Sequence, residues 1–213
     1  MSPALATLVG RLGRRLAMSS GGGGTGGGGG VGRGSGTQGG GRGRSTARAS
    51  SVGGRAAVGV YGLRGGHAGA LQELGLSLDE LTGLPRHEQA KRLLEAAMGP
   101  SGGVNESELR LANAELILWA LNEESEPLPI DLANRWVVEY VWQVWITEAG
   151  PTIRNHAANG YDSRRVEAEM RAALEATVEA GGLPDDRPLT AGDFETAIAS
   201  ALGSLERVGG PSS

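Results

Sequence analysis

The segment from residue 19 to residue 44 limits what this chain can fold into more than any other part, because 16 of its 26 residues are glycine. Serine, threonine, glutamine and arginine fill most of the other positions. Glycine loses more backbone freedom on folding than any other residue and brings no side chain to a core. We therefore expect this segment to be disordered, with its ends roughly 25–30 Å apart on average as a flexible coil.

The charge of the chain is divided between its two parts. Residues 1–72 contain nine arginines and no acidic residue, whereas residues 73–213 contain 24 acidic against 11 basic residues. The net charge of −4 is therefore the sum of +9 and −13. The chain has no cysteine, which excludes disulfides and thiolate metal sites and fits a cytoplasmic location.

Residues 1–18 have an apolar stripe with helical spacing. The stripe and the basic residues beside it are Leu5, Leu8, Val9, Leu12 and Leu16 with Arg11, Arg14 and Arg15. The pattern predicts a short amphipathic helix, with Ser2 as its cap and Pro3 at its first position. Attachment to a membrane surface is a further hypothesis for this segment. Alternatively, translation begins at Met18 and the preceding residues are not part of the protein.

The domain organisation follows from these changes in composition. We expect a disordered Gly/Ser/Arg-rich tail and hinge over residues 19–69, a helical domain over residues 70–208 and a flexible end over residues 209–213. Within the hinge, residues 45–69 carry arginines among alanine, valine and glycine. This stretch is expected either to form a weak helix or to stay loose.

Helix start and stop signals recur regularly after residue 70. Capping pairs and proline starts alternate with glycine and proline stops. The helices expected from these signals cover residues 77–83, 85–98, 105 to the prolines at 127 and 129, 131–149 with Gly150 and Pro151 as terminator, 163–180, and 190 to just before 209. There is no sustained alternation typical of strands. The predicted fold is all-α, a bundle of about five to seven helices.

Four aromatic residues lie within ten positions, and they are half of the aromatic residues of the chain: Trp136, Tyr140, Trp142 and Trp145. On a helix they make the surface apolar nearly all the way round, which is typical of a central core helix or of a helix that also meets a partner. A nucleotide-stacking platform is a third interpretation. As a partner-binding candidate we take all four residues.

The arginines of the tail are the other candidate contacts: Arg33, Arg42, Arg44 and Arg48. Arginine among glycine and serine resembles segments that bind RNA through phosphate contacts and stacking. The charge is sparse, however, and no aromatic residue precedes Tyr61. A linker or a protein-docking tail is therefore the favoured interpretation over nucleic-acid binding.

No pattern of catalytic residues is present. The three histidines are not at metal-ligand spacing, and the glycine-rich region has no phosphate-loop lysine. We therefore expect no enzyme, no cofactor and no metal site. No apolar run approaches the roughly 20 residues that span a bilayer.

Several stretches resemble the QatB family, a component of the QatABCD anti-phage defence systems of bacteria. The matching stretches are LGLSLDELTGLP at residues 74–85, MGPSGGVNESELRLANAEL at 98–116, VWITEAGPTIRN at 144–155 and VEAEMRAALEATV at 166–178. The order of a Ser/Gly-rich start, an Arg-bearing stretch and an acidic helical region is also similar. In this chain the nearest match to the usual start of the family is at Met18.

The resemblance implies an intracellular defence protein without assigned catalytic residues. Its implied partners are an ATPase, a QueC-like enzyme and a TatD-like nuclease. The leading hypothesis is a non-enzymatic partner subunit whose helical body docks on companions and whose flexible tail is presented to one of them. The alternative hypothesis is a nucleic-acid-binding adaptor that acts through the Arg/Gly tail.

Overall fold

The computed structural model describes residues 42–99, 106–157 and 163–208, with side chains described for all of these except 42–45, 148–157, 163, 166 and 206–208. The described residues form eight helices and no strand: α2 (Arg42–Arg64), α3 (Ala68–Gln72), α4 (Leu78–Thr82), α5 (Arg86–Met98), α6 (Ser107–Asn122), α7 (Pro129–Ala157), α8 (Ser163–Thr177) and α9 (Ala191–Val208). The all-α prediction is confirmed. The predictions for residues 1–41 and 209–213 lie outside the described residues.

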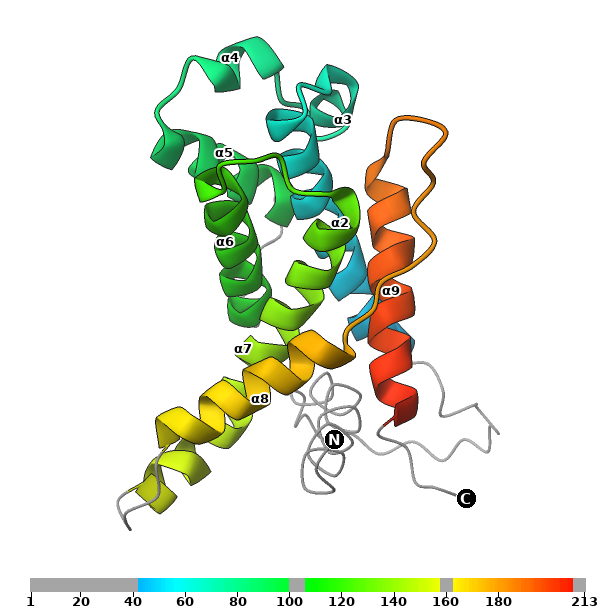
Figure 1. Ribbon diagram of the computed structural model, residues 1–213. Coiled ribbons are helices and arrows are strands. Elements are labelled where there is room, and N and C mark those ends of the chain that lie inside the picture. The colour runs from blue at the N-terminus through cyan, green and yellow to red at the C-terminus, as the bar shows by residue number, and fades with distance from the viewer. Residues whose placement is uncertain (1–41, 100–105, 158–162, 209–213) are drawn as a thin grey trace, which may run out of the picture.

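Helix α2 is at the centre of the bundle, where α9 lies along one side of it and α5 and α6 lie along the other (Figure 1). Its valines and alanines from Val52 to Val60 are at most 1% exposed. The predicted border at residue 70 is therefore wrong, because α2 lies within the supposed hinge and is packed in the helical body. The two helices that raise the number above the expected five to seven, α2 and α3, both lie in or beside that supposed hinge.

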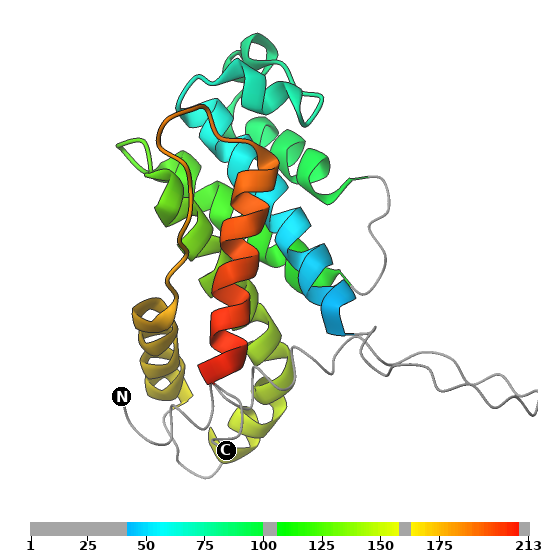
Figure 2. The ribbon, with the colours of Figure 1, turned by 90° about the vertical axis from the view of Figure 1, so that its right-hand side faces the viewer.

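The sequence of α2 resembles a linker because its small residues are the packing surface. A Cβ atom added to Gly53 would lie 2.6 Å from atoms of the Trp136 ring, and one added to Gly54 would lie 2.7 Å from the backbone oxygen of Ala191. Because glycine has no side chain, each of these two positions lets a neighbouring helix approach α2 more closely than any other residue would allow. In Figure 2, α9 crosses in front of α2, and the two helices are in contact. The apolar surface that buries α2 therefore comes mainly from its neighbours.

The signals for helix ends were accurate where they are local. Ser77 caps α4 and accepts a hydrogen bond from the Glu80 N–H, as the capping pair predicts. Helix α5 follows Pro85 and ends at Gly99, whose φ of 70° is the left-handed conformation that favours glycine. Thr190 and Asp193 form the predicted capping pair at the start of α9.

The predicted stop at Gly150 and Pro151 is wrong, because α7 continues through both residues to Ala157. Proline removes one helical hydrogen bond and crowds the preceding residue. Here that residue is glycine, which has no Cβ for the ring to strike, so part of the usual cost is absent. Helix α8 instead ends at Thr177, three residues before the expected end at Ala180.

We expect Gly53→Ala to lower the free energy of unfolding by about 1–3 kcal/mol, because the new methyl group overlaps the Trp136 ring. Chemical denaturation followed by circular dichroism measures this change. Gly69→Ala in α3 is the matched control, since no atom beyond its chain neighbours and the backbone of its own helix lies within 4 Å of its added Cβ. The control should be neutral or stabilising by up to about 1 kcal/mol. Equal effects of the two substitutions would contradict the close approach.

The cap of α9 should depend on pH. Asp193 accepts hydrogen bonds from Arg187 and from the Thr190 hydroxyl and N–H, and these bonds hold the pKa of its carboxyl well below the usual range. A lowered pKa contributes stability that is complete above the unfolded-state pKa of about 4 and is lost as the pH falls through the folded-state pKa.

Asp193→Ala should therefore lower the free energy of unfolding by about 1 kcal/mol at pH 7. The difference from wild type should shrink as the pH falls from 5 to 2 in a denaturation series. Asp185→Ala, at a nearby exposed carboxylate, should change stability by less than about 0.5 kcal/mol at either pH. A difference for Asp193→Ala that is constant with pH would contradict the assignment.

Candidate docking site

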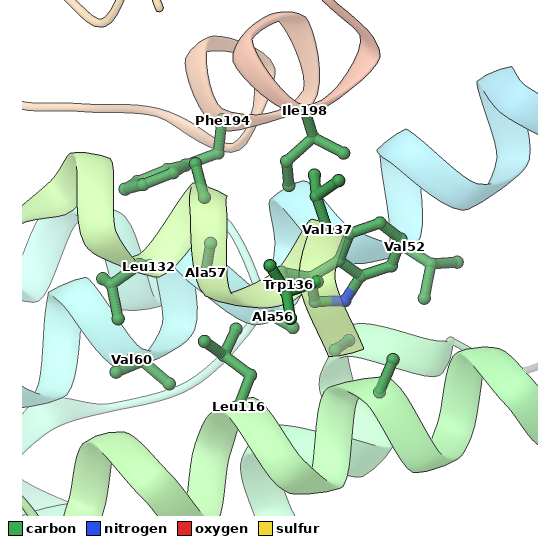
Figure 3. Packing of buried hydrophobic residues seen from close by; sticks show 14 of the residues in the cluster. Val52, Ala56, Ala57, Val60, Leu116, Leu132, Trp136, Val137, Phe194 and Ile198 are labelled. Atoms are coloured by element: carbon green, nitrogen blue, oxygen red, sulfur yellow. The ribbon is translucent and has the colours of Figure 1, made fainter. Parts of the chain in front are cut away.

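Trp136 is a core residue, so its predicted role in partner binding is wrong for the folded chain. Its side chain is 0% exposed and lies against Gly53. Its indole N–H donates to Asn113 Oδ1 at 2.6 Å, and the Asn113 amide donates to the Met98 sulfur at 3.3 Å. Figure 3 shows the ring among Val52, Ala56 and other buried side chains.

The other three aromatic candidates are also packed inward. Trp142 and Trp145 are 8% and 3% exposed, and their rings stack with centroids 5.0 Å apart. Tyr140 is half-buried and stacks on Trp136 at 5.1 Å. Burial, with a smaller contribution from the charge of Glu108, raises the pKa of Tyr140 to about 12. The four residues therefore form part of the core, which is the first of the three interpretations of their pattern.

The arginine candidates are divided between the body and the undescribed tail. Arg33 lies outside the described residues, and Arg42 and Arg44 lie in the first turn of α2 with undescribed side chains. Arg48 is turned into the body: its Nε donates to Glu106 at 3.1 Å, and its Nη2 donates to the Met98 carbonyl at 3.3 Å. Arg48 is thus a structural contact rather than a tail contact.

Two further arginines of α2 bind the carboxyl ends of neighbouring helices. Arg55 donates to the carbonyls of Ala96 and Ala97 at the end of α5, and Arg64 donates to those of Glu123 and Ser125 after α6. The Ala96 and Ala97 carbonyls lie in the last turn of α5, where carbonyls have no partner within the helix and carry its negative partial charge, whereas Glu123 and Ser125 lie just after α6. Sequence reasoning missed this role, although Arg48 and Arg55 are seven residues apart and so share a face of a helix.

A buried carboxylate that sequence reasoning also missed joins α7 to α8. Glu139 is 1% exposed, and its Oε1 pairs with Arg135 at 2.7 Å and with Arg171 of α8. Arg135 lies over the Trp119 ring and Arg171 over the Trp142 ring, with 5.5 and 5.7 Å between each guanidinium carbon and the ring centroid. The cluster is positioned to hold the two helices together.

The outer side of α6 carries exposed apolar residues. Leu111 and Leu118 are 49% and 48% exposed and lie seven residues apart, so they share one face of the helix. Glu115 lies between them and is also exposed. We call these three residues the α6 face. Figures 1 and 2 place α6 on the side of α2 away from α9, at the edge of the bundle.

Two further kinds of site, a metal-binding cluster and a membrane-spanning helix, were sought in the described part of the chain. No group of three or more His, Asp or Glu side chains in it lies close enough to hold a metal ion. None of its helices combines the length and apolar character needed to cross a bilayer. Comparison of the chain with family models, curated proteins and solved structures found no match.

Replacing the buried carboxylate should weaken the link between α7 and α8. We expect Glu139→Gln to lower the free energy of unfolding by about 1–3 kcal/mol, because two guanidinium groups lose their counter-charge at a buried position. Thermal and chemical unfolding measure the loss. Glu175→Gln removes a more exposed partner of Arg171 and should cost less than about 0.5 kcal/mol. A smaller loss for Glu139→Gln than for Glu175→Gln would contradict the assignment.

Proposed function

We propose that this protein is a non-enzymatic partner subunit of a multi-protein assembly, and that its helical body docks on companions through the α6 face. The observation that carries the proposal is the pair of half-exposed leucines, Leu111 and Leu118, on a helix whose other large apolar residues are mostly buried. Apolar side chains at helical spacing are the usual anchors where one helix packs in the groove of a partner.

The inner side of α6 supports this role. Leu116, Ile117 and Ala120 are at most 1% exposed, and α6 packs against α2, α5 and α7. A helix held on three sides presents its outer face in a fixed geometry. Binding to such a face costs little conformational entropy, because the surface is already ordered.

The contacts of the charged residues favour a structural use over a catalytic one. Arg48, Arg55 and Arg64 bind backbone carbonyls, and Glu139 links two helices. Each of these groups is engaged in holding the bundle. This supports a protein that acts by binding.

The resemblance to the QatB family extends the proposal to a bacterial anti-phage defence system and to a cytoplasmic location. The companions would be an ATPase, a QueC-like enzyme and a TatD-like nuclease. Two residues of the α6 face, Leu111 and Glu115, lie in the stretch at residues 98–116 that carries the resemblance. Presentation of the tail to a companion is part of the same proposal and concerns residues outside the described part.

The nucleic-acid alternative has lost one of its four candidate residues, because Arg48 is engaged with Glu106 and Met98. It now rests on Arg33, Arg42 and Arg44. Deleting residues 19–41 together with Arg42→Ala and Arg44→Ala removes all three arginines and distinguishes the two proposals. Docking through α6 should survive the deletion, whereas salt-dependent binding to nucleic acid through the tail should be lost.

Leu111→Asp combined with Leu118→Asp should abolish co-purification of the chain with the products of neighbouring genes. The two leucines would become buried on binding and would together contribute much of the binding free energy. Replacing both with charges should therefore weaken binding by at least about a hundredfold. Affinity purification from the native host, with the fold checked by circular dichroism, measures this. The control pairs Leu128→Asp with Ile146→Asp, two exposed apolar residues outside the α6 face. Retained binding by the α6 variant would refute the proposal.

A further inference from the structure

We propose that residues 3–16 of the same chain dock on the α6 face and cover it until a companion displaces them. The proposal deepens the proposed function, because it adds a regulator to the same docking face. The occupant is an amphipathic segment that lies outside the described residues. Three independent features support it: the spacing of apolar residues, the position of charges, and the length of the connecting chain.

The apolar residues of the two segments have the same spacing. Leu111 and Leu118 on α6 are seven residues apart, which places them roughly 10 Å apart along the helix axis. In the sequence of the N-terminal segment, Leu5 and Leu12 are also seven residues apart, with Leu8 between them. Two helices whose apolar residues repeat every seven positions can pack these residues against each other along one seam.

Charges flank the two stripes on sides that complement each other. On α6, Glu108 and Glu115 lie on one side of the leucines, and Arg110 lies on the other side. On a helix formed by the N-terminal segment, Arg11 and Arg15 lie together on one side of the stripe. The handedness of the α-helix makes the acidic and basic sides meet when the two helices run parallel, and it separates them when they run antiparallel.

The charge of the whole chain agrees with this arrangement. No acidic residue precedes Glu73, so the N-terminal segment has no negative charge that would oppose the α6 glutamates. The bulk of the acidic residues belong to the body. A basic amphipathic helix is therefore the kind of partner that this face favours, and the sequence of residues 3–16 predicts one.

The connecting chain has the length that a parallel arrangement requires. Arg48, six residues into α2, pairs with Glu106, the residue before α6, so the amino-terminal parts of α2 and α6 lie side by side. A parallel N-terminal helix ends near the other end of α6, whose 16 residues span roughly 24 Å. From their glycine-rich sequence, residues 17–41 are expected to have an average reach of roughly 25–30 Å as a flexible coil. Matching reach and span maximises the effective concentration of the tethered segment.

This effective concentration makes a weak contact sufficient. A short flexible tether gives a local concentration on the order of 1 mM. A contact with a dissociation constant of about 0.1 mM would then be occupied in about nine molecules of ten, while a companion of higher affinity still displaces the segment. The docked segment would therefore lower the apparent affinity of the α6 face for a companion by about tenfold without preventing the companion from binding.

The test uses paramagnetic broadening in the full chain. The chain has no cysteine, so Gly10→Cys provides a unique site for a nitroxide label on the side of the N-terminal helix away from its stripe. We expect the backbone amide signals of residues 111–118 to broaden, and those of α9, on the far side of α2, to stay sharp. Adding Leu8→Asp and Leu12→Asp should make the signals of residues 111–118 sharp again. Unchanged chemical shifts in α9 would confirm that the fold of this variant is intact.

The proposed pairing of the α6 glutamates with the arginines of the N-terminal segment can be tested in the same labelled chain. Glu108→Arg with Glu115→Arg should reduce the broadening of residues 111–118, and adding Arg11→Glu with Arg15→Glu should restore it. Broadening that survives the charge reversal, or that is not restored by the swap, would overturn the parallel arrangement and with it the proposal.

A mixed sample separates the same chain from a second copy. Unlabelled isotope-enriched chain is combined with labelled chain of natural isotope content, so that only contacts between molecules broaden the signals. Sharp signals in the mixture support docking within one chain. Broadening in the mixture, or no broadening of α6 in the labelled chain itself, overturns the proposal. The docking function would still stand if the α6 variant failed to bind companions, because that experiment does not involve residues 3–16.

Discussion

The approach of Trp136 to the bare backbone of Gly53 is the contact on which the rest of the bundle depends. A larger residue at position 53 has no room, since even a methyl group would lie 2.6 Å from the ring. The indole that fills this position also donates to Asn113 of α6. One side chain of α7 therefore fixes the spacing of three helices. On the next position of α2, Gly54 gives the same close approach to the backbone of α9.

The parts of the fold that the sequence predicts well are those decided within four residues. Ser77, Gly99 and the pair Thr190 and Asp193 end or begin helices through contacts with their own neighbours. Helix α2 was expected only as a weak helix or a loose hinge, because its stabilising partners are distant: Trp136 is 83 positions beyond Gly53. Local rules assign glycine only its entropic cost in a helix, about 0.5–1 kcal/mol per residue, and omit the packing that a missing side chain permits.

For the candidate residues too, neighbours in the sequence indicated the type of helix, whereas contacts with distant helices decided which side chains are buried. The aromatic pattern at 136–145 correctly indicated a helix that is apolar nearly all round, and burial then depended on α2 and α8. The exposure of Leu111 and Leu118 could not be deduced from their spacing, because α6 has a second and larger apolar stripe that contains Leu109, Ala112 and Leu116. Which stripe faces inward is decided by α2, α5 and α7.

The arrangement of the helices also changes how the division of charge along the chain is interpreted. Part of the basic excess of residues 1–72 is internal, because Arg48, Arg55 and Arg64 neutralise carbonyl groups at the ends of α5 and α6. Ordered donors at such positions satisfy groups that would otherwise be unpaired, at a cost of about 1–3 kcal/mol each if buried. The arginines of α2 therefore explain why a glycine-rich helix holds its place at the centre of an acidic body.

The same packing limits where this protein can bind others. Trp136, Trp142 and Trp145, the residues that most often anchor interfaces, are used in the core, so binding through them would require the bundle to open. An aliphatic face on a helix supported from three sides needs no such opening. The α6 face combines exposed leucines with a flanking glutamate, and a basic amphipathic helix complements both. Its apolar area is small, so in the proposed docking the affinity of a single helix for it would be modest, and tethering or the additional contacts of a large companion would decide which helix occupies it.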